Sequence, residues 1–123
     1  MRYLKAVSAV IVLVILDQAA KYLAVMHLKG NDGIPIINNV FRLYYIENRG
    51  SAFSLFQNMR IYFIVFTVIV LIVVALIYRK IPDTSRMLPL KVLAVGISAG
   101  AVGNLIDRIR FGYVVDFLYF ELI

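Results

Sequence analysis

The stretch that decides the fold is IYFIVFTVIVLIVVALIY, residues Ile61–Tyr78, which holds eighteen residues and no charged side chain. A helix needs about 20 mostly apolar residues to cross a bilayer, within a range of roughly 17–25. Ile61–Tyr78 meets this requirement by itself. Two further apolar stretches, Ala6–Leu16 and Val92–Ile106, meet it if their polar ends are included. The sequence therefore predicts an all-α membrane protein with three transmembrane helices in one domain.

The overall composition also favours a membrane protein. Of the 123 residues 63% are hydrophobic, and the mean hydropathy is +0.89. A soluble domain of this length needs a larger polar surface, because small proteins are mostly surface. The N-terminal stretch has the shape of a cleaved signal peptide, but Asp17, Gln18 and Lys21 follow its apolar core where small residues are needed for cleavage. A retained helix is the favoured interpretation.

Two classes of site are disfavoured by composition. The chain has no cysteine, and its single histidine, His27, has no second soft ligand nearby in the sequence, so we expect no metal and no other cofactor. The net charge of +6 comes from basic residues at the predicted helix ends rather than from one basic patch. Such residues are attracted to anionic lipid headgroups. We expect membrane lipids as partners and no nucleic acid.

The predicted layout alternates apolar helices with polar connections. Basic residues are densest before the first helix and between the second and third, and lysine and arginine accumulate on the cytoplasmic side. The connection after the first helix contains VFRLYYIEN, whose aromatic and β-branched residues are typical of short strands. It is either a compact connector or a small sheet over a site. The predicted segments are helix 5–27, outer β-rich segment 28–60, helix 61–79, cytoplasmic link 80–87, helix 88–108 and outer tail 109–123.

Polar side chains in the first helix form one candidate cluster. Asp17 and Lys21 are four residues apart and share a helical face. They are either a self-neutralising pair near the outer end or part of a polar interior. Ionisable groups inside a membrane are costly and often functional, so both interpretations stay open at this stage.

The third helix and the tail carry the second cluster. Gly96 and Gly100 predict close helix packing. After them, Asn104, Asp107 and Arg108 have the spacing to face one space, and we expect Arg108 to neutralise Asp107.

Asp116 differs because its neighbours in the sequence are apolar and include no cation. Lost hydration is expected to raise the pKa of its carboxyl toward neutrality, as acid–base chemistry requires. Without a metal, a Ser–His or a Cys–His pair, peptide hydrolysis needs two carboxyls that share a proton. Asp107 is a conceivable partner, although we expect Arg108 to keep it ionised and occupied.

Four motifs in order give a family resemblance that covers almost the whole chain. They are DQAAK at 17–21, NRGSAF at 48–53, GNLIDR at 103–108 and VVDF at 114–117. Together they resemble lipoprotein signal peptidase, the type II signal peptidase of bacteria. The resemblance implies a four-helix intramembrane aspartyl peptidase. Such an enzyme cleaves the signal peptide of a prolipoprotein before its diacylglyceryl-modified cysteine, at the outer face of the cytoplasmic (inner) membrane.

The resemblance also implies roles for individual residues. Asp116 takes the position of one catalytic aspartate. Asn48, Asn104 and Arg108 fall on substrate-binding positions. Asp17, Lys21 and Asp107 are supporting polar groups.

One part of the family pattern is not found in this sequence. The family's second catalytic aspartate lies in an F-N-x-A-D box at the start of a fourth helix, and the 123 residues contain neither. By resemblance this aspartate would lie beyond Ile123, and Glu121 is too near Asp116 to replace it. We therefore expect a truncated peptidase, unstable without the fourth helix and of little or no activity. The alternatives are a non-catalytic small membrane protein whose charges serve packing, ion passage or lipid contact, and an active peptidase that uses Asp107.

Overall fold

The computed structural model describes residues 3–49 and 59–120, which form three long helices and one small sheet. The helices are α1 (Leu4–Leu28), α2 (Arg60–Lys80) and α3 (Leu88–Phe111), and a 3-10 turn, η2 (Ser85–Met87), leads into α3. All three are long and apolar enough to cross a membrane. The shortest, α2, has 21 residues. At about 1.5 Å per residue it matches a hydrocarbon core about 30 Å thick.

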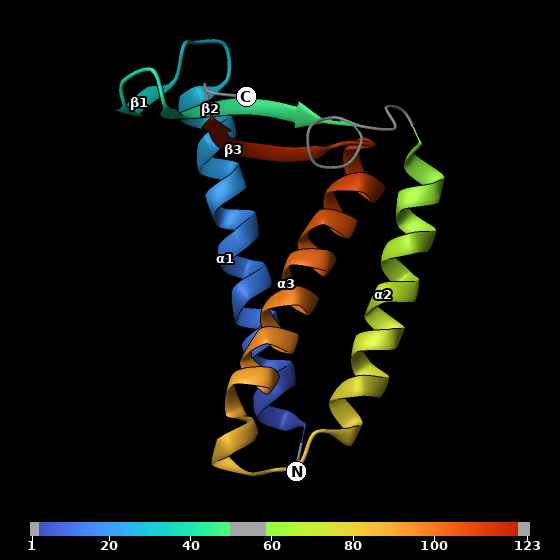
Figure 1. The fold of residues 1–123 in the computed structure, drawn as a ribbon. Helices are drawn as coiled ribbons and strands as arrows, with labels where there is room; N and C mark the ends of the chain where they lie inside the picture. Colours follow the sequence, from blue (N-terminus) through green and yellow to red (C-terminus); the bar gives the residue numbers. More distant parts are fainter. Residues whose placement is uncertain (1–2, 50–58, 121–123) are drawn as a thin grey trace.

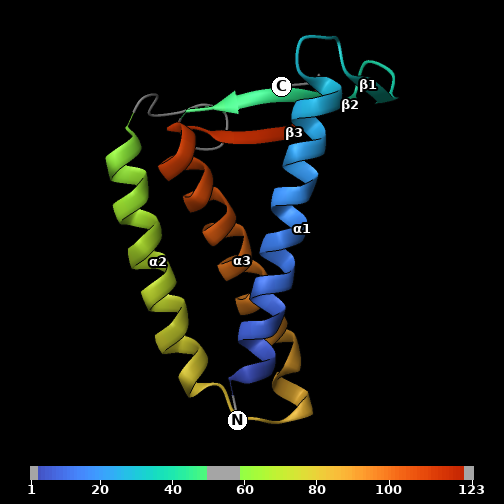
Figure 2. The ribbon, with the colours of Figure 1, turned by 180° about the vertical axis from the view of Figure 1, so that it is seen from behind.

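The helix α3 lies between α1 and α2 and packs against both (Figures 1 and 2). The N-terminal end of α1 and the link between α2 and α3 lie at one end of the molecule, and the sheet crosses the other end (Figure 1). Large apolar side chains cover the outer faces of the helices; Ile61, Tyr62 and Phe66 of α2, for example, are all more than 60% exposed. Such faces suit contact with lipid rather than with water.

The sheet has three antiparallel strands in the order β1 (Ile34–Ile37), β2 (Phe41–Asn48) and β3 (Val114–Phe120). A small sheet, and not a plain connector, therefore follows α1. The sequence predicted strands only between the first two helices, and β3 from the outer tail is the difference. Five of the seven residues in its sequence V-V-D-F-L-Y-F are β-branched or aromatic, and aromatic pairs join it to β2: the ring centroids of Phe41 and Phe120 are 5.0 Å apart.

The register between β2 and β3 shifts next to the candidate catalytic residue. Leu43 pairs with Leu118, but Ile46 pairs with Asp116, so β2 holds one extra residue between these two pairs. This is a β-bulge, which bends a strand and re-aims the side chains beyond it. The bulge therefore sets which residues of β2 share a face of the sheet with Asp116.

Gly112 connects α3 to β3. The helix runs to Phe111 rather than to the predicted Arg108, and Gly112 ends it with φ +85° while its N–H donates to the carbonyl of Arg108 at 3.0 Å. A left-handed residue at a helix C-terminus is commonly glycine. The Arg60 guanidinium of α2 donates to the carbonyl of Ile109, so α2 also contacts this turn. These contacts fix where β3 begins.

Candidate functional site

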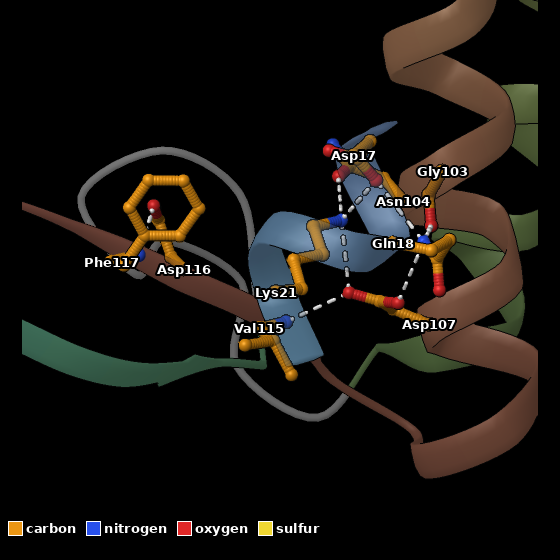
Figure 3. A network of polar contacts seen from close by, with 9 residues as sticks. All are labelled: Asp17, Gln18, Lys21, Gly103, Asn104, Asp107, Val115, Asp116 and Phe117. Carbon is orange, nitrogen blue, oxygen red and sulfur yellow. Dashed lines mark hydrogen bonds and ion pairs between the residues drawn. The ribbon is translucent and has the colours of Figure 1, made fainter. Parts of the chain in front are cut away.

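Lys21 is the centre of a polar network between α1 and α3 (Figure 3). Its Nζ lies 3.0 Å from Oδ2 of Asp17, 3.0 Å from Oδ2 of Asp107 and 3.2 Å from Oδ1 of Asn104. A lysine ammonium has three N–H donors, so each has an acceptor. The residue is 7% exposed. Both interpretations of Asp17 and Lys21 therefore hold, because the i,i+4 pair is present and also faces a polar interior.

Asp107 joins three elements of the fold. It is 1% exposed, and its Oδ2 accepts from Lys21 Nζ of α1 and from the backbone N–H of Val115 in β3 at 3.0 Å. Its Oδ1 accepts from Gln18 Nε2 at 3.3 Å. A carboxyl held by three donors is poorly placed to share a proton with Asp116, which disfavours the interpretation in which Asp107 is the second catalytic acid.

Lys21 of α1 is a cation beside Asp107 that the sequence did not predict, and it acts in addition to the expected electrostatic attraction between Asp107 and its neighbour Arg108. Successive helical residues point about 100° apart. Asp107 faces α1, whereas the Arg108 guanidinium lies 4.7 Å from the ring centroid of Phe63 on α2. Arg108 therefore contributes a cation–π contact that joins α3 to α2.

Asp116 lies on β3, beside the network but outside it. It is half-buried, and its Oδ1 accepts from the backbone N–H groups of Phe117 at 2.8 Å and Leu118 at 3.3 Å. Figure 3 shows its carboxylate pointing away from Lys21 and Asp107. Asp116 is connected to the network through its neighbour in the chain, because Asp107 accepts a hydrogen bond from the backbone N–H of Val115, the residue before Asp116.

The register places Asn48 near Asp116. Asn48 pairs with Val114, and Ile46 pairs with Asp116. Side chains of paired residues and of residues two apart share a face, so Asn48 and Asp116 lie diagonally on the same face of the sheet.

The predicted site residues thus fall into three groups. Four of them form the network around Lys21, two share the sheet face of Asp116, and Arg108 faces α2. Gly50–Phe53 of the N-R-G-S-A-F motif, Glu121 and the last residue, Ile123, lie outside the described residues. The position of the second catalytic aspartate, expected beyond Ile123, therefore stays a prediction.

Two hydrogen-bond donors that hold the site together were not predicted from the sequence. Gln18 donates to Asp17, to Asp107 and to the carbonyl of Gly103, all within 3.3 Å. The sequence feature that could have identified Gln18 as a site residue is its place inside the D-Q-A-A-K motif. The backbone N–H of Val115 leaves no such signal, because any residue except proline supplies one.

A second polar group fixes the end of β2. The hydroxyl of Tyr45 donates to Glu47 at 3.0 Å, and Arg49 contacts the same carboxylate at 3.2 Å while lying 4.8 Å from the ring centroid of Tyr113. Burial, together with hydrogen bonds to Tyr113 and Glu47, raises the pKa of Tyr45, so its hydroxyl remains a donor to Glu47 in alkaline solution as well. This group holds the strand next to Asn48.

Within residues 3–49 and 59–120, no three His, Asp or Glu side chains are grouped to hold a metal.

The helices α1 and α3 approach each other closely at Gly103, and replacing it by alanine is expected to destabilise the protein. A Cβ there would collide with Oδ2 of Asp17, which cannot move aside without breaking its contacts with Lys21 and Gln18. Overpacking of this kind costs about 1–3 kcal/mol. We predict a lower midpoint of thermal unfolding in detergent for Gly103→Ala.

Gly100→Ala is the matched control, one turn away on the same helix. Nothing described lies within 4 Å of a Cβ at Gly96 or Gly100, so the close packing expected there occurs instead at Gly103 and the buried Ala99. Gly100→Ala should leave the midpoint unchanged or raise it, because alanine favours a helix over glycine by about 1 kcal/mol. Equal losses for both variants would contradict this assignment.

Comparison with known proteins gives one consistent family. The family described as signal peptidase (SPase) II matches residues 9–123. A lipoprotein signal peptidase of Caldanaerobacter subterraneus subsp. tengcongensis is 45% identical over 116 residues, which are 94% of this chain and 78% of the relative. That of Streptococcus thermophilus is 36% identical over 123 residues, all of this chain and 79% of the relative.

Solved structures agree with the sequence comparison. A protein described as a bacterial membrane enzyme superposes with a TM-score of 0.77 at 32% identity, over 94% of this chain and 70% of its own. A second, with the same description, has a TM-score of 0.77 at 29% identity, over 96% and 75%. The three apolar helices and the small sheet are therefore features of known membrane enzymes.

Proposed function

Because the chain belongs to the signal peptidase II family, we propose that it acts as an intramembrane aspartyl peptidase on diacylglyceryl-modified prolipoproteins. The bond to be cut would lie just before the lipid-bearing cysteine. The observation that carries the proposal is the hydrogen bond from the Val115 N–H to Asp107. It links Asp116, the proposed catalytic acid, to a network built from the D-Q-A-A-K and G-N-L-I-D-R motifs.

Asp116 would supply one of two carboxyls. In the ionised form it accepts a proton from water while the water oxygen attacks the scissile carbonyl carbon. The partner carboxyl, in the protonated form, donates to the carbonyl oxygen. The resulting diol collapses as the C–N bond breaks: Asp116 gives the proton it took from water to the leaving amine, and one diol hydroxyl returns its proton to the partner carboxylate as the new carbonyl forms. By family resemblance the partner belongs to an F-N-x-A-D box, which these 123 residues do not contain.

The contacts around the site support substrate-binding roles for Asn48 and Asn104. Asn104 accepts from Lys21 through Oδ1, so its amide N–H₂ remains a donor for a peptide carbonyl. Asn48 shares its sheet face with Asp116. Arg108 would act less directly, because it packs on Phe63 of α2 and shapes the wall of the site.

We further propose that the sheet faces the outer side of the cytoplasmic membrane. The opposite end of the bundle carries Lys5, Arg79, Lys80, Arg86 and Lys91. Basic residues in short cytoplasmic segments set orientation in this direction. The prolipoprotein would then meet the site after its translocation.

A cleavage assay with a lipidated prolipoprotein in detergent tests the proposal. A polypeptide limited to these 123 residues is expected to release little or no signal peptide. A chimera that adds the C-terminal part of the Caldanaerobacter relative, where the family resemblance predicts the F-N-x-A-D box and the following helix, should cleave, because the second carboxyl is restored. Full turnover by the 123 residues alone, or a folded chimera without activity, would each overturn the proposed pairing of carboxyls.

A further inference from the structure

A cavity lies at the end of the molecule opposite the sheet. It has a volume of about 420 Å³ and lies between the first turns of α1, the last turns of α2 and the middle of α3. Small-ligand sites measure roughly 300–1,000 Å³. The lining is almost entirely apolar; it includes Val7, Ile11, Leu76, Ala94, Val95 and, as its one charged residue, Arg79. We call this cavity the lower groove.

Apart from Ser98, which lies inside α3, the polar side chains of the lower groove lie near the ends of its helices. The rings of Tyr3 and Tyr78 are 6.0 Å apart, and Arg79 is the penultimate residue of α2. Lys91 is ion-paired with Asp83, whereas no carboxylate of the described residues pairs with the exposed Arg79. Tyrosine and arginine at such a position mark the level of lipid headgroups. The Arg79 guanidinium is therefore placed to bind an anionic group of a ligand whose other part is apolar.

We propose that the lower groove binds one anionic glycerophospholipid, with an acyl chain against the apolar lining and the headgroup phosphate at Arg79. Charge complementarity supports an anionic ligand, because the described residues at this end of the bundle include five cations, Lys5, Arg79, Lys80, Arg86 and Lys91, and the carboxylate of Asp83. Basic pockets between transmembrane helices bind such headgroups. The groove shares no lining residue with the Lys21 network, so the inference does not depend on the proposed peptidase function.

The test is native mass spectrometry of the full 123-residue chain, released from membranes that contain equal amounts of phosphatidylglycerol and phosphatidylcholine. Phosphatidylglycerol adducts are expected to predominate. Arg79→Gln should reduce them about fivefold, which corresponds to the roughly 1 kcal/mol that one basic residue contributes near a membrane surface. Arg86→Gln removes a cation from the same end but does not line the groove, and it should leave the adducts nearly unchanged.

A second pair of variants tests the apolar part of the groove. Ala75→Phe fills it and should remove adducts of both lipids, whereas Ala19→Phe adds the same ring to an exposed position of α1 outside it. Equal adducts of the two lipids would overturn the proposal, as would equal losses for Arg79→Gln and Arg86→Gln. Retention of adducts in Ala75→Phe would show that lipid binds elsewhere.

Discussion

Replacing Lys21 by methionine is expected to lower the free energy of unfolding by about 3–5 kcal/mol, the cost of removing one member of a buried ion pair. The Lys21 ammonium is within 3.0 Å of both the Asp17 and Asp107 carboxylates. Methionine keeps the length of the side chain but leaves these two carboxylates side by side without a cation. Unfolding in mixed micelles, followed by circular dichroism, measures the loss.

Lys29→Met is the matched control. Lys29 follows α1 and is exposed, and its Nζ lies 5.3 Å from the ring centroid of Tyr45. Exposed charge contacts contribute about 1 kcal/mol or less, so this variant should unfold nearly as the parent does. A similar loss in both variants would contradict a special role for Lys21.

A double-mutant cycle then isolates the interaction with Asp107. Lys21→Met combined with Asp107→Asn removes the cation and one of the anions, so it should lose less than the sum of the two single variants. The expected interaction energy is about 0.5–3 kcal/mol, the range for residues in contact. Strict additivity would mean that the 3.0 Å contact between Lys21 and Asp107 has no energetic consequence.

The helices could be predicted from the sequence because a bilayer demands a simple pattern. Long uncharged runs such as Ile61–Tyr78 appear whatever the tertiary structure is. The spacing of Asp17 and Lys21 likewise indicated that they could pair, which was one of the two interpretations left open, since i,i+4 contacts are local. These predictions needed no knowledge of how one helix lies against another.

The second cation at Asp107 could not be predicted in the same way. Sequence adjacency predicted the attraction between Asp107 and Arg108, but the contact with Lys21 arises because the rotation of α3 turns Asp107 to α1, while the Arg108 guanidinium also packs on Phe63 of α2. The same rotation places Gly103 rather than Gly100 at the helix contact. Such contacts depend on how each helix is rotated about its axis relative to its neighbours, which the spacing of residues along one helix does not determine.

The strand β3 could not be predicted from the sequence for a different reason. Its residues have strand-like composition, but they follow a membrane span and carry the V-V-D-F motif, so they were interpreted only as a tail with a site residue. Pairing with β2 across more than sixty residues of sequence decided the outcome. That pairing also brings Asn48 to the face of Asp116, which no local pattern predicts.

Asp116→Asn in the chimera described above is expected to reduce the rate of prolipoprotein cleavage by about 10²–10⁴, the usual contribution of a positioned acid–base group. Asparagine keeps the shape of the side chain and can still accept from the backbone N–H groups of Phe117 and Leu118. It cannot take a proton from water. The loss should therefore appear in kcat with little change in KM, measured by release of the signal peptide.

Asp83→Asn is the control for this loss of charge, because Asp83 pairs with Lys91 at the opposite end of the bundle. It should retain the parental rate. Asp116 does not touch the Lys21 network, so Asp116→Asn should also keep the parental free energy of unfolding, unlike Lys21→Met. Loss of activity together with loss of stability would mean that Asp116 supports the fold, and retained activity would remove it from the chemistry. An inactive but fully folded Asp116→Asn protein is the outcome that separates the proposed catalytic carboxyl from the carboxyls that hold the helices together.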